Sequence, residues 1–130
     1  MFVLDTNTLI YFFKGMGQVA EHLLGTPPSE IAVPAIVYYE LQVGIAKSTA
    51  PEKRIQQLDE MLGLVTLLPL DAPVARKAAS IRADLEAAGT PIGPMDNLIA
   101  GTALAHDGVL VTHNLAEFSR VKDLRIVDWY

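Results

Sequence analysis

Five short apolar runs constrain this chain more than any other feature of its sequence. A strand with one face in water alternates apolar and polar residues, whereas a strand buried on both faces forms a continuous apolar run. The runs fall at residues 2–4, 31–33, 63–70, 108–112 and 124–129, and helical patterns separate them. The sequence therefore predicts an α/β fold with a mostly parallel central sheet covered by helices on both faces.

Four helices are expected between these strands. Pro34 suits the first position of a helix that continues over residues 35–47, because proline has no backbone N–H to leave unpaired there. The other three helices are expected at 51–63, 72–88 and 94–108, each ended by a glycine, at positions 63, 89 and 108 respectively.

The length and composition favour one cytoplasmic domain over residues 1–130. The chain has no cysteine, which excludes disulfides and thiolate metal sites. No apolar run approaches the roughly 20 residues of a membrane span. The first residues also lack the basic stretch of a signal peptide.

Four acidic residues are candidates for a shared site. Ligands bind at the carboxyl ends of the strands in an open parallel sheet. Asp5 directly follows the first apolar run, and Glu117 lies shortly after the fourth. Asp96 begins a helix, while Glu40 lies in a mostly apolar helix with no lysine or arginine one turn away.

Each acid also has an interpretation that involves no site. Asp5 is a preferred helix N-cap, and Asp96 suits the positive end of a helix dipole. Asn114 and Glu117 have the spacing of a capping box. For Glu40 the usual interpretation, a solvated helix surface, is weaker because its neighbours are apolar.

If the four carboxylates converge, they need a cation or protons between them. Two like charges about 4 Å apart repel by roughly 4 kcal/mol at an effective dielectric constant near 20. Oxygen ligands without cysteine or a histidine set favour hard ions, Mg²⁺ or Mn²⁺, and such sites suit phosphodiester hydrolysis. Among the histidines, His22 and His106 are expected to be structural, and His113 is a minor candidate for substrate contact.

Four motifs resemble those of a known family across essentially the whole chain. They are "LDTN", "YYELQVGIAKS", "GTPIGPMDNLIAGTAL" and "VLVTHNLAEFSRVKDLRIVDW". In this order and spacing they resemble PIN-domain ribonucleases, and more closely the VapC-type toxins of bacterial type II toxin–antitoxin systems. The resemblance implies a PIN-like α/β/α sandwich and a Mg²⁺-dependent endoribonuclease in which Mn²⁺ can substitute.

The resemblance also implies roles for particular residues. Asp5 and Asp96 would be the main metal ligands, and Glu40 and Glu117 would complete the acidic site directly or through water. Glu117 stands where the family often has aspartate, and its longer side chain favours contact through water. The remaining implied residues are supporting ones: Asn7, and Thr112 and Asn114 of a T-x-N element.

The implied partners are a cognate small antitoxin, a second copy of the chain, and structured RNA, with tRNA the leading class. Operator DNA would be bound only through the antitoxin, and no membrane is involved. The expected mechanism is attack of a metal-activated water on the phosphodiester, and it predicts products with 5′-phosphate and 3′-hydroxyl ends. The alternative is a non-catalytic, metal-binding PIN-like module that captures RNA or an antitoxin. An aspartyl-phosphate phosphatase is excluded, since its second acid would stand where Asn7 lies.

The net charge of −5 opposes binding of RNA through phosphate contacts alone. Without the four site acids, 11 acidic residues remain against 10 basic ones. Recognition is therefore expected to depend on RNA shape and unpaired bases. Tyr11, Phe12 and Phe13 are interpreted either as a partner groove or as core. The candidate RNA contacts are Lys14, Lys47, Arg82, Arg120 and Lys122.

Overall fold

The computed structural model describes residues 1–130 and contains one five-stranded, all-parallel sheet in the order β3-β2-β1-β4-β5. The strands coincide with the five apolar runs and confirm the predicted parallel sheet. Their bounds are β1 (Phe2–Leu4), β2 (Ile31–Pro34), β3 (Thr66–Leu68), β4 (Val109–Val111) and β5 (Arg125–Val127).

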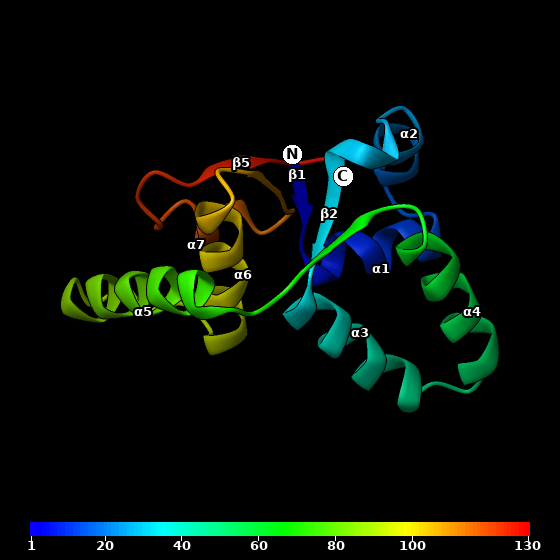
Figure 1. Ribbon diagram of the computed structural model, residues 1–130, viewed down its shortest axis with the longest axis horizontal. Coiled ribbons are helices and arrows are strands. Elements are labelled where there is room, and N and C mark those ends of the chain that lie inside the picture. Colours follow the sequence, from blue (N-terminus) through cyan, green and yellow to red (C-terminus); the bar gives the residue numbers. More distant parts are fainter.

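Helices cover both faces of this sheet, as predicted. Helices α1 to α4 lie on one side of the strands and α5 to α7 on the other (Figure 1). This follows from the strand order, because the chain winds outward from β1 to β3 and then returns past β1 to β4, with crossovers of one hand. The helices are α1 (Thr6–Lys14), α2 (Val19–Leu24), α3 (Ala35–Ala46), α4 (Pro51–Leu62), α5 (Ala72–Ala87), α6 (Pro94–Ala105) and α7 (Leu115–Phe118), with a 3₁₀ turn η1 (Pro28–Glu30) before β2. None of them is long and apolar enough to cross a membrane.

Two helix boundaries differ from the prediction. Pro34 ends β2 and caps α3, which begins one residue later at Ala35. Helix α6 stops at Ala105 because Asp107 adopts a left-handed conformation (φ 51°). Gly108 is required for a different reason, since a Cβ there would lie 2.8 Å from the Val3 side chain.

Strand β1 lies at the centre of the sheet and of the core. Val3 and Leu4 are fully buried, as are Leu110 and Val111 of the neighbouring β4. From β1 the chain passes to β2 on one side, whereas β4 lies on the other, so the strand order reverses there. This is the switch point at which open α/β sheets form a crevice at the strands' carboxyl ends.

Helices α5 and α6 pack closely through small residues. A Cβ added at Gly101 of α6 would lie within 2.8–2.9 Å of the Ala78 backbone and Cβ on α5. Gly101→Ala is therefore expected to lower the free energy of unfolding by about 1–3 kcal/mol. Gly44→Ala in α3 is the control, because nothing lies within 4 Å of a Cβ there and the change is expected to be neutral or to stabilise by about 0.5–1 kcal/mol. Urea denaturation measures both, and an equal effect of the two changes would contradict the close packing.

Candidate active site

Asp5 both caps a helix and occupies the switch point. Its Oδ1 accepts a hydrogen bond from the Thr8 backbone N–H at 2.8 Å, so it is the N-cap of α1. The side chain is only 4% exposed, although it follows the strand with no basic partner. Burial raises the pKa of the Asp5 carboxyl above its ordinary value, while hydrogen bonds from Thr112 and Thr8 oppose that rise. The capping and the site interpretations of Asp5 are therefore compatible.

Glu40 is half-buried and points toward the start of α1. Its Oε1 accepts a hydrogen bond from the Thr6 hydroxyl at 2.6 Å, which joins α3 to α1 across 34 residues of sequence. Thr6 directly follows Asp5 in the chain, so this bond places the Glu40 carboxylate beside the end of β1. The apolar surroundings of Glu40 noted in the sequence are those of a helix packed on α1.

Asp96 and Glu117 meet at the start of α6. Glu117 Oε1 accepts the Gly93 backbone N–H at 3.0 Å, and its Oε2 accepts the Asn114 side-chain amide at 2.6 Å. A Cβ on Gly93 would lie 3.5 Å from Asp96 Oδ2, and the Asp96 and Glu117 carboxyl groups share a hydrogen bond. The two acids are thus held together by the turn that precedes α6.

The four acids influence one another electrostatically. Burial is the largest cause that raises the pKa of Asp96 to about 7, followed by the charge and hydrogen bond of Glu117 and the charges of Glu40 and Asp5. The Gly93 N–H and the Asn114 amide hold the pKa of Glu117 below its usual value. One acid of the touching pair therefore takes up a proton near neutral pH while the other stays ionised.

The T-x-N element is built around Thr112, which is fully buried. Its Oγ1 accepts the Asn114 backbone N–H at 3.0 Å, and its side chain also hydrogen-bonds to Asp5. Since Thr112 takes the N–H that a capping box would pair with Glu117, the capping-box interpretation of Asn114 and Glu117 is wrong. Asn114 instead donates its amide to the Glu117 carboxylate.

Sequence reasoning missed Asp128, which directly follows β5. Val111 pairs with Leu4 on one side and with Val127 on the other, so the residues after these three strands lie side by side along the sheet edge. Asp128 is close enough for its charge to raise the pKa of Asp5 further. The rule of inspecting each strand's carboxyl end would have found it.

Asn97, next to Asp96, was also missed. It is 5% exposed, and its Oδ1 has no hydrogen-bond partner within the chain. Asn7, which the sequence suggested as a supporting residue, is exposed on α1 and makes no side-chain hydrogen bond. The structure therefore shows no hydrogen bond between Asn7 and the acids, and its supporting role stays a prediction.

The donor set fits a hard divalent ion. All four acids offer oxygen ligands, and no lysine or arginine lies within salt-bridge distance of any of them. The negative charges of three neighbours, Glu117, Glu40 and Asp5, all act on Asp96. No three acidic or histidine side chains in the structure are close enough to bind one ion together. An ion here would therefore take at most two of these side chains as direct ligands, with water completing its coordination.

The candidate RNA contacts are dispersed. Lys14 lines a pocket that also contains Glu40, and the charge of Arg120 acts on Glu117. Arg82 is engaged by Glu86 at 2.9 Å on the exposed face of α5, and Lys47 is exposed at the end of α3. Lys122 lines a separate hollow with Arg120. Only Lys14 and Arg120 are near the acids.

The sequence and fold match a known family along nearly the whole chain. The family model of the PIN domain matches residues 2–124. The tRNA(fMet)-specific endonuclease VapC of Salmonella typhimurium is 37% identical over 128 residues, which cover 98% of this chain and 97% of that protein. Ribonuclease VapC2 of Rickettsia felis is 31% identical over 137 residues, covering 99% of this chain and 98% of that one.

A solved complex agrees with these relatives. The DNA-bound VapBC structure from Salmonella typhimurium superimposes with a TM-score of 0.92 at 36% identity, covering 99% of this chain and 98% of that chain. The chain therefore belongs to the PIN-domain family, and within it to the VapC-type ribonuclease toxins. It is an endoribonuclease, and the family resemblance and the α/β/α fold expected from the sequence are confirmed.

Proposed function

We propose that this protein is a Mg²⁺-dependent endoribonuclease toxin that acts in the cytoplasm on structured RNA, with tRNA the leading class, and that a cognate antitoxin inhibits it. The observation that carries the proposal is the acidic site at the switch point. The charges of Glu117, Glu40 and Asp5 all act on Asp96 there, no lysine or arginine forms a salt bridge with any of the four acids, and the pKa of Asp96 is raised to about 7. PIN-domain nucleases generally use a divalent metal, which agrees with this donor set.

The four acids have different tasks in this proposal. Asp5 and Asp96 are the main ligands of Mg²⁺ or Mn²⁺, and Glu40 and Glu117 contribute directly or through water. The bound ion supplies positive charge beside the phosphate and lowers the pKa of a water molecule. Asn114 and the Gly93 N–H hold the Glu117 carboxylate in place, and Thr112 orients Asp5. Hydrolysis of this kind leaves 5′-phosphate and 3′-hydroxyl ends.

Thr6→Val tests the positioning of Glu40. The variant removes the hydroxyl that donates to Glu40 Oε1. A hydrogen bond to a charged group contributes about 1.5–3 kcal/mol, so kcat is expected to fall roughly tenfold or more. Thr6→Ser, which keeps the hydroxyl, should retain most of the wild-type rate. Steady-state cleavage kinetics compare the two, and equal rates for both variants would contradict this role of Thr6.

The substrate proposal rests on the relatives and on charge. The Salmonella relative is named for tRNA(fMet), and the present chain is too acidic to bind RNA through phosphate contacts alone. Of the candidate RNA contacts, Lys14 and Arg120 are near the acids, and Arg54 lines the same pocket as Lys14 and Glu40. Folded RNA with unpaired bases, such as tRNA, agrees with the relative's name and offers base contacts that do not depend on a positively charged protein surface.

The test is cleavage of a total tRNA pool by antitoxin-free protein. Reactions contain Mg²⁺, Mn²⁺ or EDTA, with Asp5→Asn protein as the control. We expect cuts with 5′-phosphate ends in Mg²⁺ or Mn²⁺ and none with EDTA or in the variant. A 2′,3′-cyclic phosphate product would contradict the mechanism. Ion-dependent RNA binding without any cut would instead support the alternative, a non-catalytic module that captures RNA or an antitoxin.

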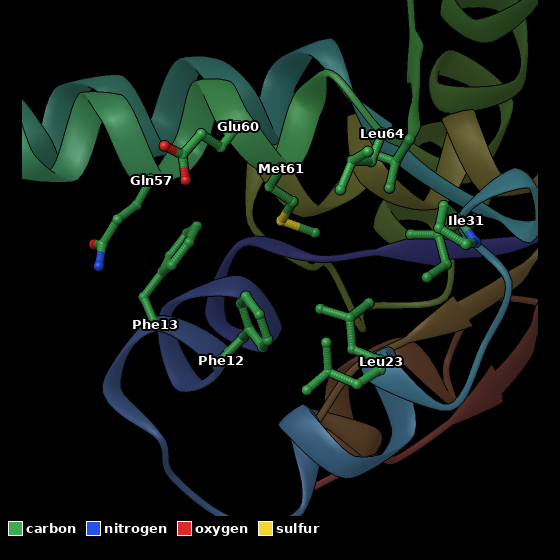
Figure 2. A pocket seen from close by; sticks show the side chains of 11 residues that line it. Phe12, Phe13, Leu23, Ile31, Gln57, Glu60, Met61 and Leu64 are labelled. Atoms are coloured by element: carbon green, nitrogen blue, oxygen red, sulfur yellow. The ribbon is translucent and has the colours of Figure 1, made fainter.

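An apolar groove supports the antitoxin proposal. Figure 2 shows Phe12 and Phe13 projecting from α1 toward Gln57 and Met61 of α4. These side chains line a cavity of ≈ 340 Å³. Leu24 and Leu64 at its margin are 79% and 69% exposed. Such a surface suits an apolar helix of a small partner.

The related VapBC structures are toxin–antitoxin complexes, two of them with DNA, which supports operator contact through the antitoxin. Homodimer formation is proposed from the family resemblance.

A further inference from the structure

Two aromatic rings stack beside the acidic site. His113 follows Thr112 at the end of β4, and Tyr130 lies two residues beyond Asp128 at the end of β5. Their ring centroids are 4.2 Å apart with 21° between the planes. Tyr11 of α1 meets both rings edge-on, at 5.9 Å from His113 and 5.0 Å from Tyr130. The three rings form a cluster on the α1 side of the sheet edge.

Hydrogen bonds fix the stacked pair in place. Asp128 Oδ2 lies 2.8 Å from His113 Nδ1, and Asp128 Oδ1 accepts the Tyr130 backbone N–H at 2.9 Å. The Tyr130 carbonyl accepts the Gln18 N–H at 2.8 Å. Gly17 makes room for the tyrosine, since a Cβ there would lie 2.8 Å from its ring. Asp128 therefore holds both members of the pair from one side.

The stack leaves aromatic surface open to solvent. The His113 side chain is 45% exposed although Tyr130 covers one of its faces, and Tyr130 is 41% exposed. The open surface of His113 therefore belongs to its other face and edge. Anchoring of this segment does not require the pair, because Trp129 is buried, packs on Phe2 and stacks with His22 on its own.

The stack adjoins the residues that surround the scissile bond in the proposed function. Thr112, which precedes His113, hydrogen-bonds to Asp5, and Asp128 acts electrostatically on Asp5. Asp96 and Glu117 lie on the other side of the strand ends, with α6 and α7. An RNA strand whose phosphate reaches the acids would have a neighbouring base within reach of His113.

We propose that His113 and Tyr130 form a stacking platform for an unpaired nucleobase next to the phosphodiester that is cut. The proposal deepens the nuclease function and rests on it. Unpaired bases stack on histidine and tyrosine rings, and this contact needs no net positive charge. It gives an acidic protein the affinity that phosphate contacts alone do not supply.

The first experiment measures base stacking without cleavage. Short single-stranded RNAs carry 2-aminopurine at each position in turn, and they are added to Asp96→Asn protein with Mg²⁺. We expect fluorescence quenching at one position, lost in His113→Ala and in Tyr130→Leu and retained in Tyr130→Phe. His22→Ala is the matched control, because it removes a histidine of α2 that stacks on Trp129 and not on Tyr130.

The second experiment measures cleavage kinetics in otherwise wild-type protein. Base–aromatic stacking predicts a roughly tenfold rise of KM in His113→Ala with kcat nearly unchanged. An abasic residue at the quenched position should raise KM for the wild type and not for the variant. Unchanged KM in His113→Ala, or quenching that survives both platform variants, would overturn the platform. Absence of any cleavage by the wild type would count against the nuclease proposal instead, and the fluorescence result would still decide the platform.

Discussion

Asp96→Asn is expected to abolish RNA cleavage and, at the same time, to stabilise the metal-free protein above neutral pH. The carboxylate is proposed as a main metal ligand, and asparagine removes its charge. The same charge is unfavourable without metal, because burial and the neighbouring Glu117, Glu40 and Asp5 raise the pKa of Asp96 to about 7. Residues placed for function commonly lower stability in this way.

The sign of the pH dependence follows from the raised pKa. In the unfolded chain Asp96 has an ordinary pKa near 3.8, so between about pH 4 and pH 7 the folded state binds the extra proton. The contribution of Asp96 to stability is complete below about pH 4 and is lost as the pH rises through about 7. The full shift of the Asp96 pKa corresponds to about 4 kcal/mol. Since the Asp96 carboxyl is half-exposed, solvent screening reduces this, and we take half of it, about 2 kcal/mol.

Urea denaturation in EDTA at about pH 5 and about pH 8 measures this effect. The free energy of unfolding should fall between the two conditions by about 1–1.5 kcal/mol more in the wild type than in Asp96→Asn, because pH 5 to pH 8 covers only part of the window between the two pKa values. Asp84→Asn, on the exposed surface of α5, is the control and should behave like the wild type. An Asp96→Asn protein that still cuts RNA, or that shows the wild-type pH dependence, would contradict the assignment of Asp96.

Asp5→Asn and Asp5→Ala are expected to differ sharply in stability but not in activity. Asparagine is as good an N-cap as aspartate, so its side chain can still accept the Thr8 N–H and keep stability within about 0.5 kcal/mol. Alanine removes the cap and leaves buried donors of Thr8 and Thr112 without an acceptor, a loss of about 2–3 kcal/mol. Both variants lose the charge, and both should lower cleavage by roughly a hundredfold or more.

Asp71 provides the matched control for capping alone. It caps α5 in the same manner, accepting the Val74 N–H at 3.2 Å, and it lies away from the acids. Asp71→Ala should therefore cost about 1 kcal/mol of stability and leave cleavage unchanged. Thermal denaturation and cleavage rates of the three variants separate the two roles of Asp5. Full activity in Asp5→Asn would mean that Asp5 is a cap and nothing more.

The sheet and four of the helices could be predicted because each depends on local pattern. Continuous apolar runs identify β1, β2 and β4 almost residue by residue, and Gly89 ends the turn after α5 in the left-handed conformation, as expected. Helix α2 was not predicted, since it has six residues and no side-chain cap at Gln18. Short elements of this kind are fixed by packing rather than by sequence signals.

The residues of the site could be predicted from the sequence, but the hydrogen bonds between them could not. Asp5 could be read from its position after a strand, but the Thr6–Glu40 hydrogen bond joins residues 34 apart and depends on how α3 packs on α1. The spacing of Asn114 and Glu117 fits two different bonding patterns, and only the fold shows that Thr112 takes the decisive N–H. Distant pairings of this kind are not encoded in any local spacing.

The central position of β1 has a consequence for a chain still on the ribosome. β1 is made first, yet one of its two neighbours is β4, at residues 109–111. A nascent chain carries Asp5 and Glu40 long before Asp96, Thr112 and Glu117 have been synthesised. The crevice can close only after the residues of β4 and α7 have emerged, as is usual for domains that fold as units. A nuclease built in this order is expected to be inert toward RNA near the ribosome that makes it until the segment with β4 and α7 has been synthesised.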